Sequence, residues 1–188
     1  QSMIHVDEQL EKDQLERAVL VGMYNRDTPR EKAEEYVAEL KLLTETAGAE
    51  TIGIFLQKLD RINPGTYVGT GKLDEIKAYL EDHGGDLVVF DDDLSPSQVR
   101  NIDKILNVKV LDRSGVILHI FSERARTAQA TAQVELAQLQ YMLPRLAGLW
   151  THLSKQKGGI GMKGAGEKEI ETDRRRVRQK DDLVRKGL

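Results

Sequence analysis

Four short apolar runs, separated by longer amphipathic stretches, constrain the fold of the first 112 residues more than any other feature. The runs cover residues 18–24, 51–59, 87–90 and 108–111. Runs of this length with few polar interruptions are typical of strands buried on both faces of a sheet. Because strands that alternate with helices form βαβ units, residues 4–112 are predicted to form an α/β domain with a small, mostly parallel sheet and flanking helices.

Two four-residue segments predict where helices between these strands begin. Residues 28–31 (TPRE) and 95–98 (SPSQ) each combine a hydroxyl cap, a proline at the first helical position and an acidic or amide residue three places after the cap. This combination is typical of a capping box. A third helix is expected from about Lys72 to residue 82, ended by Gly84 and Gly85.

The pattern changes after Asp112, where the sequence becomes rich in alanine, glutamine and leucine. Residues 114–143 lack a strong helix breaker, and their apolar side chains follow an almost heptad-like spacing. One long helix is therefore expected, bent near Pro144, before a glycine-rich segment at residues 158–166 and a second helical stretch. The simplest arrangement over residues 113–188 is a long antiparallel two-helix hairpin, with the glycine-rich segment as its tip, extending away from the sheet domain.

Charge is distributed unevenly along the chain. Residues 145–188 contain 12 Lys/Arg and 6 Asp/Glu, whereas residues 1–144 contain 16 and 25. A basic end on an acidic body favours an oriented contact with a polyanion, although a solvated helix face is the alternative. Few aromatic residues lie near the tip, so contact with the backbone of folded RNA is favoured over base stacking. The candidate RNA-binding residues are Lys155, Lys157, Gly158, Gly159, Gly161, Lys163, Gly164, Gly166, Arg174, Arg175, Arg176 and Arg178.

A second candidate site lies between a predicted strand and helix. Residues 66–73 resemble a Walker A loop, but Thr66 replaces its first glycine and Leu73 replaces the hydroxyl residue that would bind Mg²⁺. A phosphate could still bind at the start of the helix, with a structural turn as the alternative. The possible phosphate-binding residues are Gly69, Thr70, Gly71 and Lys72.

Other motifs give weaker signals. Residues 159–164 match G-x-G-x-x-G, but a helix rather than a strand precedes them, which argues against dinucleotide binding. Asp91, Asp92 and Asp93 follow a strand and could bind Mg²⁺, although a polar strand exit is the more typical role. The four histidines show no metal-ligand or triad spacing. No catalytic residue and no metal site is predicted.

Composition excludes several classes of protein. The chain has no cysteine, which excludes disulfide scaffolds and Cys-ligated zinc. No apolar stretch approaches the roughly 18 residues of a membrane-spanning helix, and we expect a cytoplasmic protein. Gln1 and Ser2 precede Met3, so residues 1–3 resemble a tag remnant and start, and the charged, uncapped end suggests a piece of a longer protein.

An ordered string of motifs carries a resemblance to a known family. The later motifs are VELAQL (134–139), LPRL (143–146), GGIG (158–161), GAGE (164–167) and ETDRRR (171–176). Upstream, YVGTGK (67–72), LSPSQ (94–98), DRSG (112–115) and RART (124–127) fit the same pattern. Together they resemble the HflX family of ribosome-associated GTPases.

The resemblance implies an N-terminal α/β domain, a two-helix extension and a Ras-like GTPase domain that uses GTP and Mg²⁺. It also implies binding to ribosomal RNA on the large ribosomal subunit, with the glycine-rich tip directed toward the peptidyl-transferase region, and a role in splitting or rescuing ribosomes. This chain contains neither G-x-x-x-x-G-K-[ST] nor Asn-Lys-x-Asp, so we expect it to be non-enzymatic and without a cofactor. The alternatives are an auxiliary nucleotide-binding domain and a regulatory domain that packs on the family's C-terminal GTPase domain.

Overall fold

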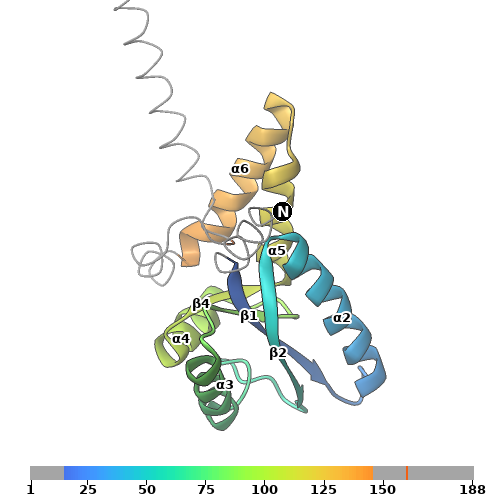
Figure 1. Cartoon of the computed structure of the whole chain (residues 1–188), viewed down its shortest axis with the longest axis vertical. Helices are drawn as coiled ribbons and strands as arrows, with labels where there is room; N and C mark the ends of the chain where they lie inside the picture. The colour runs from blue at the N-terminus through green and yellow to red at the C-terminus, as the bar shows by residue number, and fades with distance from the viewer. Residues whose placement is uncertain (1–14, 146–159, 161–188) are drawn as a thin grey trace, which may run out of the picture.

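The computed structural model describes residues 15–145 and residue 160 (Figure 1). Within this part of the chain, four strands alternate with helices and two further helices follow. The elements are β1 (Glu16–Tyr24), α2 (Arg30–Thr46), β2 (Ala49–Lys58), α3 (Thr70–His83), β3 (Leu87–Phe90), α4 (Pro96–Leu106), β4 (Lys109–Asp112), α5 (Arg113–Arg124), α6 (Ala128–Met142) and a 3₁₀ turn at Leu143–Arg145. The predicted α/β class is confirmed.

The strands form one parallel sheet in the order β2-β1-β3-β4. The chain first moves outward from β1 to β2, then crosses back past β1 to β3 and continues to β4. As a result, helices cover both faces: apolar residues of α2 and α5 pack on one face, and those of α3 and α4 pack on the other. The parallel sheet predicted from the sequence is thus confirmed.

Burial on both faces explains the uninterrupted apolar runs. In β1, Val19 and Val21 pack with α3 and α4, whereas Ala18 and Leu20 pack with α2 and α5. All four residues are at most 2% exposed. Since neither face of β1 meets water, its sequence lacks the polar alternation of a half-exposed strand.

The two predicted capping boxes have different outcomes. At α4 the prediction is confirmed, because Ser95 Oγ accepts from Gln98 N and Gln98 Oε1 accepts from Ser95 N. At α2 it is wrong: the cap position is Pro29 and no side chain caps the helix. Asn25 Oδ1 instead accepts the backbone N–H of Thr28 at 2.8 Å, which holds Thr28 in a turn before the helix begins.

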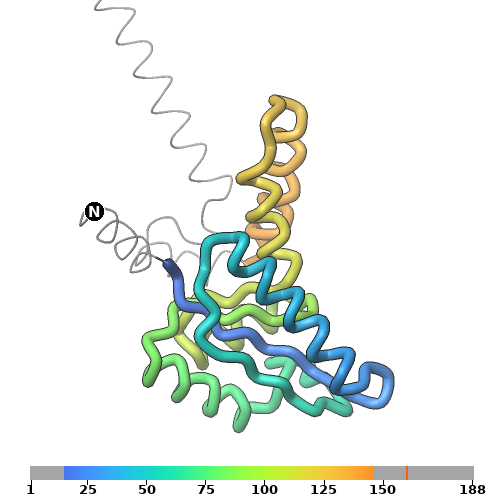
Figure 2. Tube along the Cα trace, turned by 45° about the vertical axis from the view of Figure 1, so that its right-hand side comes forward, coloured from blue at the N-terminus to red at the C-terminus, as the bar shows by residue number. Residues whose placement is uncertain are grey.

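The prediction of one long helix from residue 114 to 143 is also wrong. Ala125 has an extended backbone, and Thr127 Oγ1 accepts the N–H of Ala130 at 3.1 Å to begin α6. The chain therefore turns between α5 and α6, and the two helices project from the sheet side by side (Figures 1 and 2). The Thr127 hydroxyl caps the start of a new helix at a position where the first helix could have continued. The apolar spacing is the same in both helices, so it does not indicate the break between them.

The expected return arm of the hairpin, residues 167–186, lies outside the described residues. So does the glycine-rich segment, except for Ile160. That side chain is 3% exposed and belongs to the apolar cluster between the sheet, α2 and α5. Its backbone N–H donates to Glu16 Oε1 at the start of β1. The one described residue of the expected tip thus lies on the α/β domain, and among residues 15–145 the turn between α5 and α6 lies at the projecting end.

Among the helices that the structure describes, none combines the length and the apolar character that crossing a membrane requires.

Candidate functional site

The carboxyl edge of a parallel sheet is the usual position of a ligand site in this class of fold. In open α/β sheets, ligands bind at this edge where neighbouring connections leave in opposite directions. Here that point lies between β1 and β3, because β1 leads to α2 on one face and β3 leads to α4 on the other. The three aspartates singled out in the sequence follow β3 directly at this point.

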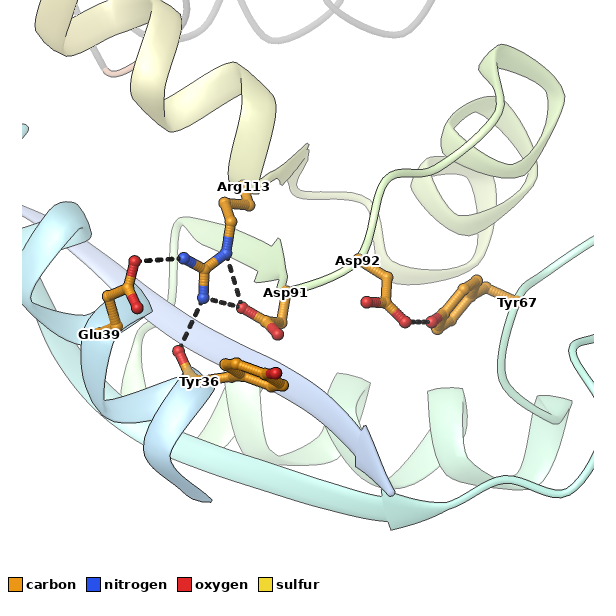
Figure 3. A network of polar contacts seen from close by, with 6 residues as sticks. All are labelled: Tyr36, Glu39, Tyr67, Asp91, Asp92 and Arg113. Carbon is orange, nitrogen blue, oxygen red and sulfur yellow. Dashed lines mark hydrogen bonds and ion pairs between the residues drawn. The ribbon is translucent and has the colours of Figure 1, made fainter. Parts of the chain in front are cut away.

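Arg113, the first residue of α5, ties three elements together at this edge (Figure 3). Its Nε donates to Asp91 Oδ1 at 3.0 Å and its Nη1 donates to Glu39 Oε1 at 2.9 Å. Its Nη2 donates to the carbonyl of Tyr36 at 2.8 Å. The guanidinium therefore joins β3 and α5 to α2, and its donors are directed at protein acceptors rather than at an open site.

The charges in this network perturb one another. Burial raises the pKa of the Asp91 carboxyl above its ordinary range, although the Arg113 guanidinium acts in the opposite direction. Burial alone would lower the pKa of Arg113, but its hydrogen bonds and charge interactions with Asp91 and Glu39 outweigh this effect and raise it. Arg113 thus stays charged and holds two carboxylates at the surface of the sheet domain.

Asp92 accepts a hydrogen bond from the phenol of Tyr67, as Figure 3 shows. Tyr67 is 4% exposed and has a positive φ of 64°, which non-glycine residues seldom adopt. The bridge between Tyr67 and Asn63 closes the loop before α3 and holds this conformation. The phenol also lies 3.0 Å from the sulfur of Met23 at the end of β1. The Tyr67 phenol therefore contacts residues at the ends of both β1 and β3.

The third aspartate accepts from Ser114 Oγ at 2.6 Å, so each of the three carboxylates has a partner within the protein. Over residues 15–145, no group of three or more His, Asp or Glu side chains is arranged to hold a metal ion. The geometry favours the interpretation of Asp91, Asp92 and Asp93 as a polar strand exit.

The possible phosphate-binding residues lie together at the start of α3. Gly69 is the cap residue, and Thr70, Gly71 and Lys72 form the first turn. The ammonium of Lys72 lies 2.8 Å from Glu75 Oε2 and 5.5 Å from the ring centre of Phe55. Phosphate binding at these four residues stays a prediction, and it requires Lys72 to leave Glu75.

Sequence reasoning missed a buried carboxylate that joins α6 to the sheet domain. Asp112 is 1% exposed; its Oδ1 accepts from Gly115 N at 3.0 Å and from the phenol of Tyr141 at 2.8 Å. Its Oδ2 accepts from Leu94 N at 3.0 Å. A β-carbon on Gly115 would lie 2.6 Å from the Tyr141 phenol oxygen, so a side chain at this position would displace Tyr141.

Arg145 completes this joint at the end of the described chain. Its Nη2 donates to the carbonyl of Leu94 at 3.0 Å, and its guanidinium lies 4.0 Å from the ring centre of Tyr141. Arg100 donates to the carbonyl of Pro144 at 2.8 Å. The point from which residues 146–188 depart is therefore held on the α/β domain. An Asp-x-x-Gly pattern at residues 112–115 indicates the cap, but nothing local indicates Tyr141 or Arg145 as partners.

The twelve predicted RNA-binding residues, from Lys155 to Arg178, all lie outside the described residues. Their assignment stays a prediction, as do the domain boundaries at residues 3 and 112.

The ionisation of Tyr67 and Tyr141 is expected to coincide with alkaline unfolding. Burial first, and then the neighbouring Asp92 and Asp112 carboxylates, raise the pKa of these phenols far above the ordinary value of 10.0. Because the folded-state pKa exceeds the unfolded one, their contribution to stability is complete below about pH 10 and is lost as the pH rises further. When the pH is raised and tyrosinate absorbance is followed, Tyr67→Phe should reduce the absorbance increase that accompanies unfolding. If Tyr67→Phe reduces only the absorbance increase that precedes unfolding, the Tyr67 phenol ionises in the folded protein and the prediction is wrong.

Two family models match this chain. The model described as GTP-binding GTPase N-terminal matches residues 34–122, and the model described as GTP-binding GTPase Middle Region matches residues 124–188. The boundary between the two matches falls at the end of α5, close to the turn that leads into α6.

Several curated relatives are named GTPase HflX. The protein from Flavobacterium psychrophilum is 52% identical over 95% of this chain, and that from Caldanaerobacter subterraneus is 46% identical over 96%. The protein from Escherichia coli is 42% identical over 88%. This chain spans 44%, 41% and 38% of the length of these relatives, respectively.

A solved structure shares the fold. A GTP-binding protein from the archaeon Sulfolobus solfataricus in complex with GDP is 26% identical, with a TM-score of 0.52. The match covers 83% of this chain and 46% of the archaeal chain.

Proposed function

Because this chain belongs to the HflX family of GTPases, in which it matches the N-terminal and middle regions, we propose that it is the ribosome-binding and RNA-binding part of a translational GTPase. Its partner is the large ribosomal subunit, and its contacts are made mainly with ribosomal RNA. The observation that carries the proposal is the charge imbalance, with 12 basic and 6 acidic residues from residue 145 onward.

The described part of the chain supports a contact made by this basic end. On the α/β domain, several cations lie beside acids on the same helix: Arg30 beside Glu34, Lys41 beside Glu45 and Lys72 beside Glu75. Residues 1–144 also carry a clear acidic excess. A surface of this kind repels phosphates, so the basic end determines the orientation of an approaching polyanion.

The joint at Asp112 supports a positioning role for the α/β domain. Tyr141 and Arg145 hold the end of α6 against Asp112 and the Leu94 carbonyl. Residues 146–188 therefore start from a fixed point, so that a contact made by this segment is made with a defined direction.

The rest of the proposal concerns the whole protein. We infer that it binds and hydrolyses GTP with Mg²⁺ in a region that corresponds to the part of the relatives beyond this chain, and that it acts in the cytoplasm in ribosome splitting or rescue. The archaeal protein of similar fold is a GTP-binding protein in complex with GDP, which supports nucleotide binding by the whole protein. The lack of both nucleotide-binding motifs in residues 1–188 supports a binding rather than an enzymatic role for this chain.

Reversing three lysine charges is expected to weaken binding to large ribosomal subunits by at least about tenfold. The change is Lys155→Glu, Lys157→Glu and Lys163→Glu in one variant. Each lost phosphate contact reduces counterion release, so the slope of log affinity against log salt should fall by roughly two to three. Co-sedimentation of the 188-residue chain with purified large subunits at several salt concentrations measures both quantities.

A matched control replaces Arg30, Lys32 and Lys41 with glutamate, since each of these lies beside an acid on the α/β domain. This control should bind as the unmodified chain does. A salt-independent affinity, or equal losses for both triple variants, would overturn the assignment of the contact to the basic end.

A further inference from the structure

The turn between α5 and α6 is the part of the described chain that lies farthest from the sheet (Figures 1 and 2). Residues 125–127 form this connection. We call residues 121–127 the distal turn. The sequence alone placed the glycine-rich segment at the projecting end, but its described residue, Ile160, is buried on the α/β domain. Among the described residues, the distal turn is thus the part that would reach a partner first.

Two arginines of the distal turn are exposed and form no ion pair with the acids of residues 15–145. Arg124 and Arg126 are both exposed, and within the described residues neither guanidinium forms an ion pair. One Nη1 donor of Arg126 binds the carbonyl of Glu123 at 3.0 Å, which leaves the rest of its fork directed outward. The Glu123 carboxylate lies 3.2 Å from the His119 ring instead.

Three arginines on the body of the domain, Arg17, Arg30 and Arg113, each lie within 4 Å of a carboxylate. Other body arginines, such as Arg61, resemble those of the distal turn in forming no ion pair among the described residues; the distal-turn pair differs in lying two residues apart at the projecting end. The distal turn contains these two arginines and one acid, Glu123, whose carboxylate lies beside the His119 ring, so its formal net charge is +1. The distal turn is therefore a small positive site on a predominantly acidic body.

An aromatic ring lies beside these charges. Phe121 is 54% exposed, and it precedes Arg124 by three residues on α5, so both side chains lie on one face of the helix. An exposed ring next to guanidinium groups provides both a stacking surface and phosphate donors. Nucleic acid offers both chemistries at once, whereas an acidic peptide offers only the charge.

We propose that the distal turn is a second RNA contact, in which Arg124 and Arg126 bind phosphates and Phe121 stacks on an unpaired base. The inference rests on the proposed RNA-binding function and extends it to residues outside the basic end. A narrow pair of helices with charge at its end suits the irregular surface of folded RNA, where single-stranded loops present unstacked bases. Guanidinium forks also match phosphate geometry better than ammonium groups do.

The test reverses both charges in the full 188-residue chain, as Arg124→Glu with Arg126→Glu. Binding is measured by co-sedimentation with large ribosomal subunits and by fluorescence anisotropy with a labelled RNA hairpin that has an unpaired loop. We expect about a tenfold loss of affinity for both probes and a salt slope reduced by about two, since two phosphate contacts are lost. Phe121→Ala should weaken hairpin binding severalfold with an unchanged salt slope, because stacking releases no counterions.

Two further variants keep the result interpretable. Arg61→Glu with Lys104→Glu reverses two exposed cations elsewhere and should leave binding unchanged. Arg124→Gln with Arg126→Gln should give a smaller loss than the charge reversal. All variants should keep the thermal midpoint of the unmodified chain, because the replaced side chains are exposed.

Four results would overturn the inference. If the distal-turn variant binds as the unmodified chain does while the Lys155, Lys157 and Lys163 variant is weakened, only this inference fails. If the control with Arg61 and Lys104 loses as much affinity as the distal-turn variant, the effect is one of net charge. If polyglutamate displaces the chain as well as RNA of equal charge does, the partner is an acidic protein. If the unmodified chain binds neither probe, the proposed function fails as well.

Discussion

Replacing Asp112 with alanine is expected to lower the free energy of unfolding by about 3–5 kcal/mol. The carboxylate is buried and accepts from the N–H groups of Leu94 and Gly115 and from the phenol of Tyr141. Alanine would leave three donors without an acceptor in a dry environment and would remove the cap of α5. Urea unfolding followed by circular dichroism measures the change.

Two comparisons separate this effect from a general loss of charge. Asp93→Ala removes an exposed carboxylate whose hydrogen-bond partner among the described residues is Ser114 Oγ, and it should cost less than about 1 kcal/mol. Tyr141→Phe should cost about 1–2 kcal/mol by itself, and much less when Asp112 is already alanine, because both changes remove the same contact. Strict additivity of the two changes would show that Tyr141 and Asp112 do not act together.

Replacing Lys109 with methionine is expected to cost about 3 kcal/mol or more, because it leaves a buried carboxylate without its counter-charge. The Lys109 side chain is 1% exposed and its Nζ lies 2.7 Å from Glu16 Oε2, which is 12% exposed at side-chain level. A second change, Glu16→Gln, should recover most of the loss. The glutamine oxygen keeps an acceptor for the Ile160 N–H while removing the unpaired charge.

An exposed pair provides the control. Arg17 and Glu50 lie 3.5 Å apart with side chains 43% and 51% exposed. Arg17→Met should therefore change the free energy of unfolding by no more than about 1 kcal/mol. If Lys109→Met costs no more than this, or if adding Glu16→Gln makes the loss larger, the Glu16–Lys109 pair is not the source of the effect.

The strands could be predicted from the sequence because burial on both faces leaves a local signal. Leu87–Phe90 is apolar at every position, and the structure places a strand at those four residues with no shift. The start of α4 was equally readable, since a capping box uses side chains three residues apart. In both cases, the residues that identify the strand or the helix start in the sequence are the same residues that form it.

The break between α5 and α6 could not be predicted, because it depends on what the helices contact rather than on their spacing. Val116 and Ile120 pack on the sheet, whereas α6 has Gln138 as its one buried residue. Regularly spaced apolar positions run through both helices, and this spacing predicts one continuous helix. The cap at Thr127 decides between one helix and two, and this residue also fits a helix interior.

For the site residues, too, a local pattern could be predicted from the sequence, whereas a contact between distant residues could not. Asp91, Asp92 and Asp93 were visible as a run at the end of a strand, but their role as partners of Arg113, Tyr67 and Ser114 depends on contacts made 21 to 25 residues along the chain. The contact between Asp112 and Tyr141 gave no local signal, since the two residues lie 29 positions apart. Contacts at this separation leave no periodic trace in a single sequence.

The strand order has a consequence for synthesis of the chain on the ribosome. The first strand to emerge, β1, lies between β2 and β3, so it receives its second neighbour only after Phe90 has been made. The cluster on one of its faces is complete only when Ile160 arrives, 144 residues after Glu16. Long-range closures of this kind fold slowly and leave strand edges exposed to wrong pairing. A nascent chain must therefore keep its first apolar strand from incorrect partners until Ile160 has left the exit tunnel.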